Sequence, residues 1–403
     1  MTQQQSGRRY DIDALRVLAF AILILYHTGM YYVADWGWHV KSVHQFEWLQ
    51  DLMLLPNQWR MSLLFFISGM AMALVNGKYS AGALFRLRSK RLLIPLIFSM
   101  YVIVAPQLYF ELVYNRGYDQ SYLTFWWQYI DIHTDLFPDK QSVIGLLTWN
   151  HLWYLPYLYC YSLLMLTGGG LLKRFAHWTP LQAVPLWTCL LVLMVILTCF
   201  WLTLGQHFPS THALINDWYY HAKYLLVFSC GYVFVFQQQW WQQAINQRKK
   251  LLLGALLGYL FVLCDNHGFI PGWIDLSAYP ILKQGLYAMA YFANQWLWIV
   301  AVLGYGGYWL NRPSKWLSYA NQAILPWYIF HQTLIILAAM AIKSWHLPAL
   351  PEAALIVLMT VSGCYLGYEL VKRFAITRLL FGLKLFESPQ RNPKPGTAPL
   401  PES

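Results

Sequence analysis

The sequence predicts an all-α protein, a polytopic membrane helix bundle of about ten transmembrane helices. Composition gives the first reason, because the 403 residues are 58% hydrophobic and only 11% charged. A typical soluble domain has about 25% charged residues. The second reason is that the apolar residues gather in runs, most of them long enough for a membrane span of about 20 residues. Backbone polar groups cannot stay unpaired in lipid, so these runs are expected to be helices.

Ten apolar runs follow one another along the chain, and we expect a helix in each. They lie at about residues 15–33, 63–76, 92–113, 152–172, 183–204, 219–236, 251–264, 284–310, 323–342 and 353–371. The second and seventh runs are short and are expected to borrow flanking residues. We expect one membrane domain over residues 1–386, and a disordered cytoplasmic tail, rich in proline and polar residues, over 387–403.

The basic residues are shared unevenly between the connections. With ten spans both termini lie on one side of the membrane, and 20 of the 28 Lys and Arg residues fall on that side. The positive-inside rule then places both termini in the cytoplasm. The net charge of +11 does not indicate nucleic-acid binding, because the basic residues form short clusters between apolar runs. The six cysteines show no CxxC spacing, so neither a disulfide framework nor a metal site is predicted.

Three ionisable residues lie in or beside the first span, namely Asp13, Arg16 and His27. Arg16 and His27 are eleven residues apart, which puts them on one helix face with about 16 Å of rise between them. Buried ionisable groups usually face a cavity or a partner. His27 is therefore a candidate general base that takes a proton from a hydroxyl, or a candidate nucleophile that forms a covalent acyl-histidine. The alternatives are membrane anchoring for Arg16 and a hydrogen bond to a neighbouring helix for His27.

A cluster of five basic residues follows the second span, between Lys78 and Arg91. Its arginines are Arg86, Arg88 and Arg91. Arginine binds phosphate oxygens through two parallel hydrogen bonds, so this loop is a candidate site for the phosphates of coenzyme A. Binding of anionic lipid headgroups is the alternative.

The connection over residues 114–151 is rich in aromatic residues and carries four aspartates. Trp126 and Trp127 lie in it, and aromatic faces beside carboxylates suit a sugar. Anchoring at the membrane interface is the other interpretation of these tryptophans.

Several short motifs together resemble acyltransferase family 3, the multi-span membrane acyltransferases of bacteria. The matches are DIDAL at 11–15 with the Arg16-x10-His27 spacing, FFISG at 65–69, RSKR at 88–91, YIFH at 328–331 and YE at 368–369. They run in the expected order over nearly the whole chain. Three further stretches, at 60–61, 151–155 and 329–332, resemble the glucans biosynthesis protein C branch, although Gln332 stands where that branch tends to carry a second histidine.

The resemblance implies a multi-pass enzyme of the bacterial inner membrane that takes an acyl group from acyl-CoA on the cytoplasmic side. The acceptor would be a hydroxyl of a periplasmic or surface glycan, and the branch implies succinyl, with acetyl as the other choice. No permanently bound cofactor is expected. Arg16, Arg86, Arg88 and Arg91 would hold the donor, and His27, Arg16 and His331 would be catalytic. Arg60, His151, Trp153, Trp126 and Trp127 are the expected acceptor-binding residues.

Two other function classes stay open at the level of the sequence. A transporter or flippase for a glycan or a lipid-linked precursor would also need many spans and buried ionisable groups. No internal repeat supports that class. A non-enzymatic assembly factor would leave the shared face of Arg16 and His27 without a role.

Overall fold

Helices account for nearly all regular structure in the computed structural model, which describes residues 9–270 and 278–385. The all-α prediction is therefore confirmed over these residues, where only isolated β-bridges interrupt the helical pattern. The predicted tail at 387–403 lies outside the described residues.

Eight helical segments within the described ranges are long and apolar enough to cross a membrane. They are Tyr10–Tyr32, Trp48–Val75, Ala81–Arg116, Asn150–Ala176, Leu186–Gly205, Pro280–Trp309, Lys315–Trp345 and Ala349–Val371. The other two expected spans are also helical. However, α11 (Trp218–Phe234) has only 17 residues, and α12 (Gln238–Asn266) begins with a polar half that contains Arg248, Lys249 and Lys250.

The other helices of the described ranges have the following bounds. In the first half of the chain these are α1 (Tyr10–Tyr32), α2 (Trp48–Asn57), α3 (Arg60–Val75), α4 (Ala81–Arg88), α5 (Ile94–Val102), α6 (Ala105–Arg116) and α7 (Tyr122–Ile130). The second half adds α8 (Tyr154–Ala176), α9 (Thr179–Ala183), α10 (Leu186–Phe200), α14 (Pro280–Trp309), α15 (Lys315–Ile342), α16 (Ala349–Val371) and α17 (Ala375–Leu380). A π-helical turn at Ser89–Leu93 joins α4 to α5, so the third span begins before the predicted residue 92.

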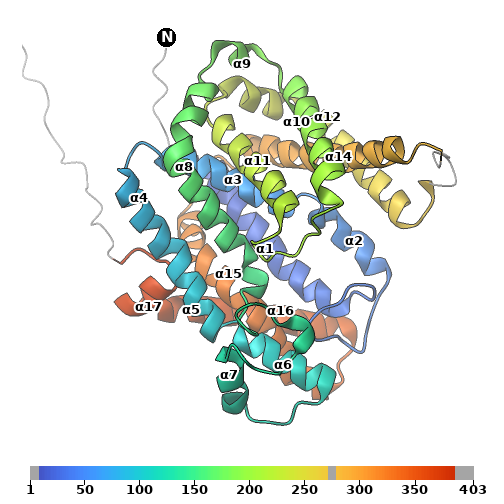
Figure 1. The fold of residues 1–403 in the computed structure, drawn as a ribbon, viewed down its shortest axis with the longest axis vertical. Coiled ribbons are helices and arrows are strands. Elements are labelled where there is room, and N and C mark those ends of the chain that lie inside the picture. Colours follow the sequence, from blue (N-terminus) through green and yellow to red (C-terminus); the bar gives the residue numbers. More distant parts are fainter. Residues whose placement is uncertain (1–8, 271–277, 386–403) are drawn as a thin grey trace, which may run out of the picture.

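Helix α1 lies in the middle of the bundle, in contact with α2, α3, α14, α15 and α16 (Figure 1). Next to it, α3 and α11 pack closely, because a Cβ added at Gly69 would lie 1.9 Å from the Phe228 carbonyl oxygen. A Cβ added at Gly231 on α11 would likewise lie 1.9 Å from the carbonyl oxygen of Phe66 on α3. Gly69 ends the FFISG motif, so the motif's glycine lets two backbones touch.

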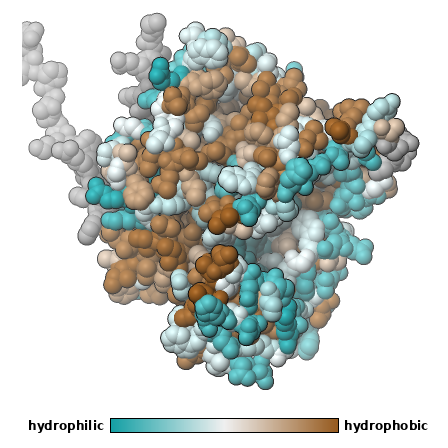
Figure 2. All heavy atoms as spheres, in the orientation of Figure 1, coloured by the Kyte–Doolittle hydropathy of each residue, from teal (hydrophilic) through white to brown (hydrophobic). Residues whose placement is uncertain are grey.

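The bundle has two distinct ends. The loop end carries the connections 33–59, 117–153 and 206–217, which are tied together by bonds such as that from Trp149 Nε1 to the His212 carbonyl oxygen at 2.8 Å. The basic end carries Arg16, the turn between α3 and α4, and α17. Figure 2 shows hydrophobic residues spread over α4, α5 and α10, and hydrophilic residues gathered around α6 and α7 at the loop end. This pattern fits a protein embedded in lipid, while the side of the membrane that each end faces stays a prediction.

Candidate active site

Two histidines from helices far apart in the sequence meet inside the bundle. His27 on α1 and His331 on α15 have ring centroids 5.0 Å apart. Nδ1 of His331 donates a hydrogen bond to the Tyr328 carbonyl oxygen at 2.8 Å, because a carbonyl oxygen can only accept. That bond leaves Nε2 of His331 as the proton acceptor. Within the described residues, Nε2 of His331 and Nδ1 of His27 are both buried with no hydrogen-bond partner.

His27 borders a cavity of about 520 Å³ at the loop end, here called the polar cavity, and His331 lies directly behind it. Helices α1, α2, α3, α11 and α15, the 3-10 turn Asn150–Trp153 and the loops that hold His39 and His212 contribute its walls. Its ionisable and polar residues are Tyr26, His27, His39, Asn57, Gln58, Arg60, Asn150, His151, His212, Tyr220, Lys223, Tyr224, Tyr328 and Gln332. The space is large enough for a sugar unit, since small-molecule sites commonly measure about 300–1,000 Å³.

Arg60 begins α3 and presents a positive charge to the polar cavity. Only 4% of the residue is exposed, and its guanidinium lies 3.8 Å from the ring centroid of Tyr26. Its Nε and Nη1 atoms have no hydrogen-bond partner among the described residues. A buried guanidinium with unused donors is suited to an oxygen that becomes negative during a reaction. Arg60 thus lines the polar cavity together with His27, while its predicted contact with an acceptor stays a prediction.

A chain of hydrogen bonds supports the cavity from the loop end. Nδ1 of His39 lies 2.5 Å from Oε2 of Glu111, which also binds Lys140. Because the carboxylate accepts, Nε2 of His39 is left to receive bonds from the amides of Asn150 (2.9 Å) and Gln332 (3.2 Å). His39 lines the polar cavity, so the Glu111–His39 pair resembles an oriented base.

His151 lies beside His331, with ring centroids 5.2 Å apart, but both its ring nitrogens are engaged. Nδ1 accepts from Gln107 at 3.2 Å, and Nε2 donates to the Ile329 carbonyl oxygen at 3.2 Å. His151 therefore fits a positioning role better than proton transfer. Trp153, two residues further on, lines the same cavity and packs against the ring of His212 at 4.2 Å.

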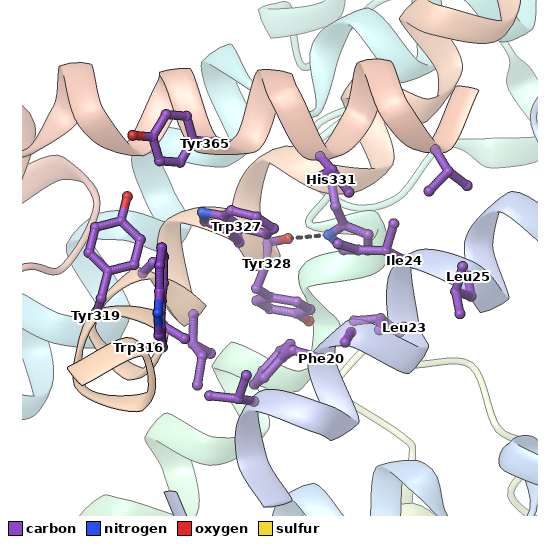
Figure 3. A pocket seen from close by; sticks show the side chains of 17 residues that line it. Phe20, Leu23, Ile24, Leu25, Trp316, Tyr319, Trp327, Tyr328, His331 and Tyr365 are labelled. Carbon is purple, nitrogen blue, oxygen red and sulfur yellow. Dashed lines mark hydrogen bonds between the residues drawn. The ribbon is translucent and has the colours of Figure 1, made fainter. Parts of the chain in front are cut away.

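A second cavity, also about 520 Å³, lies on the other side of Tyr328 between α1, α15 and α16. It is lined almost only by apolar and aromatic residues and is here called the apolar cavity. Figure 3 shows Trp316 and Tyr319 at one end of this cavity, Phe20 and Tyr328 near its middle, and His331 beyond them on the side of Ile24 and Leu25. The apolar cavity and the polar cavity share Leu23 and Tyr328 as common wall residues.

The arginines expected to bind the donor gather at the basic end, about where the apolar cavity has its far end. Arg16 donates to Asn321, which in turn donates to Asp13 at 2.9 Å. Arg88 and Arg91 lie close enough to Arg16 for mutual electrostatic repulsion. Arg86 is exposed on the outer surface of α4. Three of the four expected arginines thus form one basic cluster.

Two tyrosines lie between the basic cluster and the histidine pair. Tyr154 interacts electrostatically with Arg16 and Arg88, and its hydroxyl bonds with the Ser68 hydroxyl at 2.5 Å. Its ring centroid lies 6.3 Å from that of Tyr328, whose own hydroxyl donates to the His151 carbonyl oxygen at 2.6 Å. Arg16 and His27 therefore share a helix face, as predicted, with packed aromatic rings separating them in this conformation.

Trp126 and Trp127 do not line the polar cavity, so their expected sugar contact is not seen. Helix α7 buries Phe125 and Tyr129 instead, and these two rings fix which face points inward. Trp126 donates to the Tyr101 carbonyl oxygen at 2.8 Å, and Trp127 is 61% exposed. Their positions suit interfacial anchoring. Glu369, in the YE motif, pairs with Lys372 at 2.5 Å and accepts a hydrogen bond from the Tyr319 hydroxyl at 2.7 Å.

The fold also brings His39, Glu111, His212 and Lys223 to the site or its support. No local motif marks them, because His39 and Glu111 are 72 residues apart in the chain. Burial lowers the pKa of His212, and the weaker opposing influence of Asp217 does not cancel this effect. No cluster of His, Cys, Asp and Glu within the described ranges has the arrangement of a metal site.

Comparison with known proteins decides the family. Residues 9–369 match the acyltransferase domain of acyltransferase family 3. The chain belongs to this family. It is therefore an acyltransferase and, with its many apolar helices, a multi-pass membrane protein.

Curated relatives are similar over a shorter stretch. Glucans biosynthesis protein C from Escherichia coli strain SMS-3-5 is 26% identical over 155 residues, which are 38% of this chain and 37% of the relative. The proteins of the same name from strains K12 / DH10B and K12 are 25% identical over the same length. The matched stretch thus spans little more than a third of these relatives. No solved structure matches this chain significantly.

Proposed function

We propose that this protein is an O-acyltransferase of the bacterial inner membrane. It transfers an acyl group, succinyl or acetyl, from cytoplasmic acyl-CoA to a hydroxyl of a periplasmic or surface glycan. The observation that carries the proposal is the pair of unsatisfied imidazole nitrogens on neighbouring rings, with His27 in the wall of the polar cavity and His331 in the wall of the apolar cavity. The similarity to glucans biosynthesis protein C supports a glycan as the acceptor.

The acceptor enters from the loop end in this proposal. The polar cavity combines aromatic rings, such as those of Trp153 and Tyr220, with amides and imidazoles. Sugars bind through such combinations, because ring faces stack on aromatic side chains while hydroxyls form directed hydrogen bonds. A hydroxyl placed near His27 and His331 would give the unpaired nitrogens the partner that the described residues do not supply.

The donor enters from the basic end. Arg16, Arg88 and Arg91 would bind the phosphates of coenzyme A. The apolar cavity would hold the hydrocarbon part of the acyl group, since its walls are apolar and it reaches His331. Tyr154 and Tyr328 would have to move aside for the thioester to meet the acceptor, so binding of the donor is expected to open this contact.

The chemical step follows from these positions. His27 takes the proton of the acceptor hydroxyl as the oxygen forms a bond to the thioester carbonyl carbon. The carbonyl oxygen becomes negative and is stabilised by the guanidinium of Arg60. The carbon–sulfur bond then breaks, and the leaving thiolate takes the proton from the His27 imidazolium. The products are the ester of the glycan and free coenzyme A. His331 lies beside His27, and its Nε2 would accept a hydrogen bond from the bound acceptor.

Purified protein in lipid nanodiscs tests the proposal, with radiolabelled acetyl-CoA or succinyl-CoA and a glucan oligosaccharide. We expect label in the oligosaccharide together with an equal amount of released thiol. His27→Gln should abolish both, while His133→Gln, which changes an exposed loop-end histidine, should leave both unchanged. Equal transfer by wild type and His27→Gln would contradict the assignment of the base, and no transfer from either donor to any glucan would contradict the proposed reaction.

A further inference from the structure

A third cavity continues the polar cavity along the loop end and has no role in the reaction described so far. It measures about 580 Å³ and shares Gln58 and Lys223 with the polar cavity. We call it the lysine cavity, after Lys223 and Lys283 in its wall. Because two residues belong to both walls, a chain molecule bound in the polar cavity could extend into it.

The lysine cavity has the surface of a sugar site. Trp201, Tyr219, Tyr287 and Tyr291 contribute aromatic rings to its lining. Gln295 also lines it and is only 2% exposed, yet its Nε2 atom has no hydrogen-bond partner among the described residues. The Tyr287 hydroxyl oxygen is also buried and has no hydrogen-bond partner among the described residues. Buried donors that lack a partner are rare, so an oxygen-rich ligand is expected to satisfy them.

The charged side chains that line the two adjoining cavities, among the described residues, are all basic. Arg60, Lys223 and Lys283 line them, and none of the described lining residues is an aspartate or a glutamate. Lys223 makes no ion pair within the described ranges, and its ammonium nitrogen lies 5.5 Å from the ring centroid of Tyr224 and 5.9 Å from that of Phe292. Partly buried ammonium groups without carboxylates favour an anion as their partner.

We propose that the lysine cavity is an acceptor subsite for an anionic glycan, one that carries phosphate or carboxylate groups. The charged sugar lies against Lys223 and Lys283, and its neighbour presents the reacting hydroxyl to His27 in the polar cavity. This inference rests on the proposed function, because it assigns the acceptor of that reaction. It adds that the acceptor is selected by charge, at a place separate from the histidine pair.

Binding of defined oligosaccharides tests the subsite without relying on catalysis. The probes are cellohexaose, the same oligosaccharide oxidised to uronate at C6, and the same oligosaccharide phosphorylated at C6. We expect the two anionic forms to bind the full-length protein in nanodiscs at least about tenfold more tightly than the neutral form, since a hydrogen bond to a charged group contributes about 1.5–3 kcal/mol. The preference should fall as salt is raised.

Two variants locate the effect. Lys223→Gln and Lys283→Gln should each remove most of the preference for the anionic probes and leave binding of neutral cellohexaose nearly unchanged. Lys343→Gln is the matched control, because Lys343 also lies at the loop end but lines neither cavity. Acetyl transfer to neutral cellohexaose should also persist in Lys283→Gln, because Lys283 lines only the lysine cavity, and this separates failure of the subsite from failure of the proposed reaction.

Three results would overturn the subsite. The first is equal binding of neutral and anionic probes by the wild type. The second is an equal loss of neutral and anionic binding in the lysine variants. The third is competition by glycerol 1-phosphate, a soluble form of a lipid headgroup, that matches competition by the phosphorylated oligosaccharide. That last result would mean that the sugar is not recognised.

Discussion

The apolar cavity and the polar cavity have the same volume, about 520 Å³, and meet at the same tyrosine, yet their walls differ in kind. His331 is the ionisable imidazole in the wall of the apolar cavity. The polar cavity has four imidazoles, a guanidinium and an ammonium group in its wall. One space suits hydrocarbon and the other suits hydroxyls. In the proposed reaction this contrast would keep the two substrates apart by solubility, with Tyr328 and the histidine pair at the boundary.

The largest effect is expected at the boundary itself. His27→Ala should lower the rate of acyl transfer by about 10²–10⁴-fold, the usual contribution of a general acid–base group. His331→Ala should cause a similar loss if the two rings act together. The measurement is kcat with saturating acyl-CoA, with protein content checked by gel filtration. A residual rate within tenfold of wild type for both variants would show that the boundary is not the reaction centre.

Arg60 tests the difference between the two cavities, because it lines the polar cavity and not the apolar one. Arg60→Gln should lower kcat about 10²-fold with a smaller change in KM, since the guanidinium is assigned to the oxyanion of the transition state. Arg116→Gln removes an arginine at the loop end that pairs with Asp139 outside the cavity, and should have little effect. If Arg60→Gln raises KM for the acceptor and spares kcat, Arg60 binds substrate and does not stabilise the oxyanion.

Disrupting the Glu111–His39 pair should lower the rate of acyl transfer less, because this pair orients one side chain of the cavity wall and takes no part in the proposed proton transfer. Glu111→Gln replaces the carboxylate that orients His39, and we expect kcat to fall about tenfold, equivalent to about 1.4 kcal/mol. His39→Asn in the same background should add little further loss, since both changes disturb one contact. Additive losses in the double variant would show that the two residues act separately.

The smallest effect is expected in the apolar cavity. Ala21→Phe places a ring in its wall at an exposed position of α1. We expect turnover with hexanoyl-CoA to fall about fivefold and turnover with acetyl-CoA to stay constant, because overpacking costs about 1–3 kcal/mol where the chain would lie. Leu18→Phe, on the same helix outside this cavity, is the control. Equal losses with both donors would mean that the acyl group does not occupy this space.

The helices were the part of the molecule that the sequence predicted best, since ten apolar runs correspond to helical segments. Length and composition alone could not show that α12 extends over the polar residues before 251, or that α2 forms between the first two apolar runs. Spacing alone predicted the shared face of Arg16 and His27. His331 came only from the family resemblance, because a lone histidine in an apolar run has many structural explanations.

The acceptor side was harder to predict, and the reason is physical. His39 and Glu111 join across 72 residues of sequence, and Lys223 faces inward only because α11 packs on α3 through Gly69 and Gly231. No periodicity encodes such contacts. The positions of Trp126 and Trp127 could not be predicted for a different reason. The sequence shows an aromatic cluster, but only the packing of α7 shows that Phe125 and Tyr129 make its buried face.

The central claim is that donor and acceptor reach the histidine pair from opposite ends of the bundle. Proteoliposomes of uniform protein orientation test it most directly, with radiolabelled acyl-CoA sealed on the side of the basic end and glucan oligosaccharide on the side of the loop end. The account predicts labelled oligosaccharide on the loop-end side with wild type and none with His27→Gln. Transfer that occurs only when both substrates are on one side would contradict it.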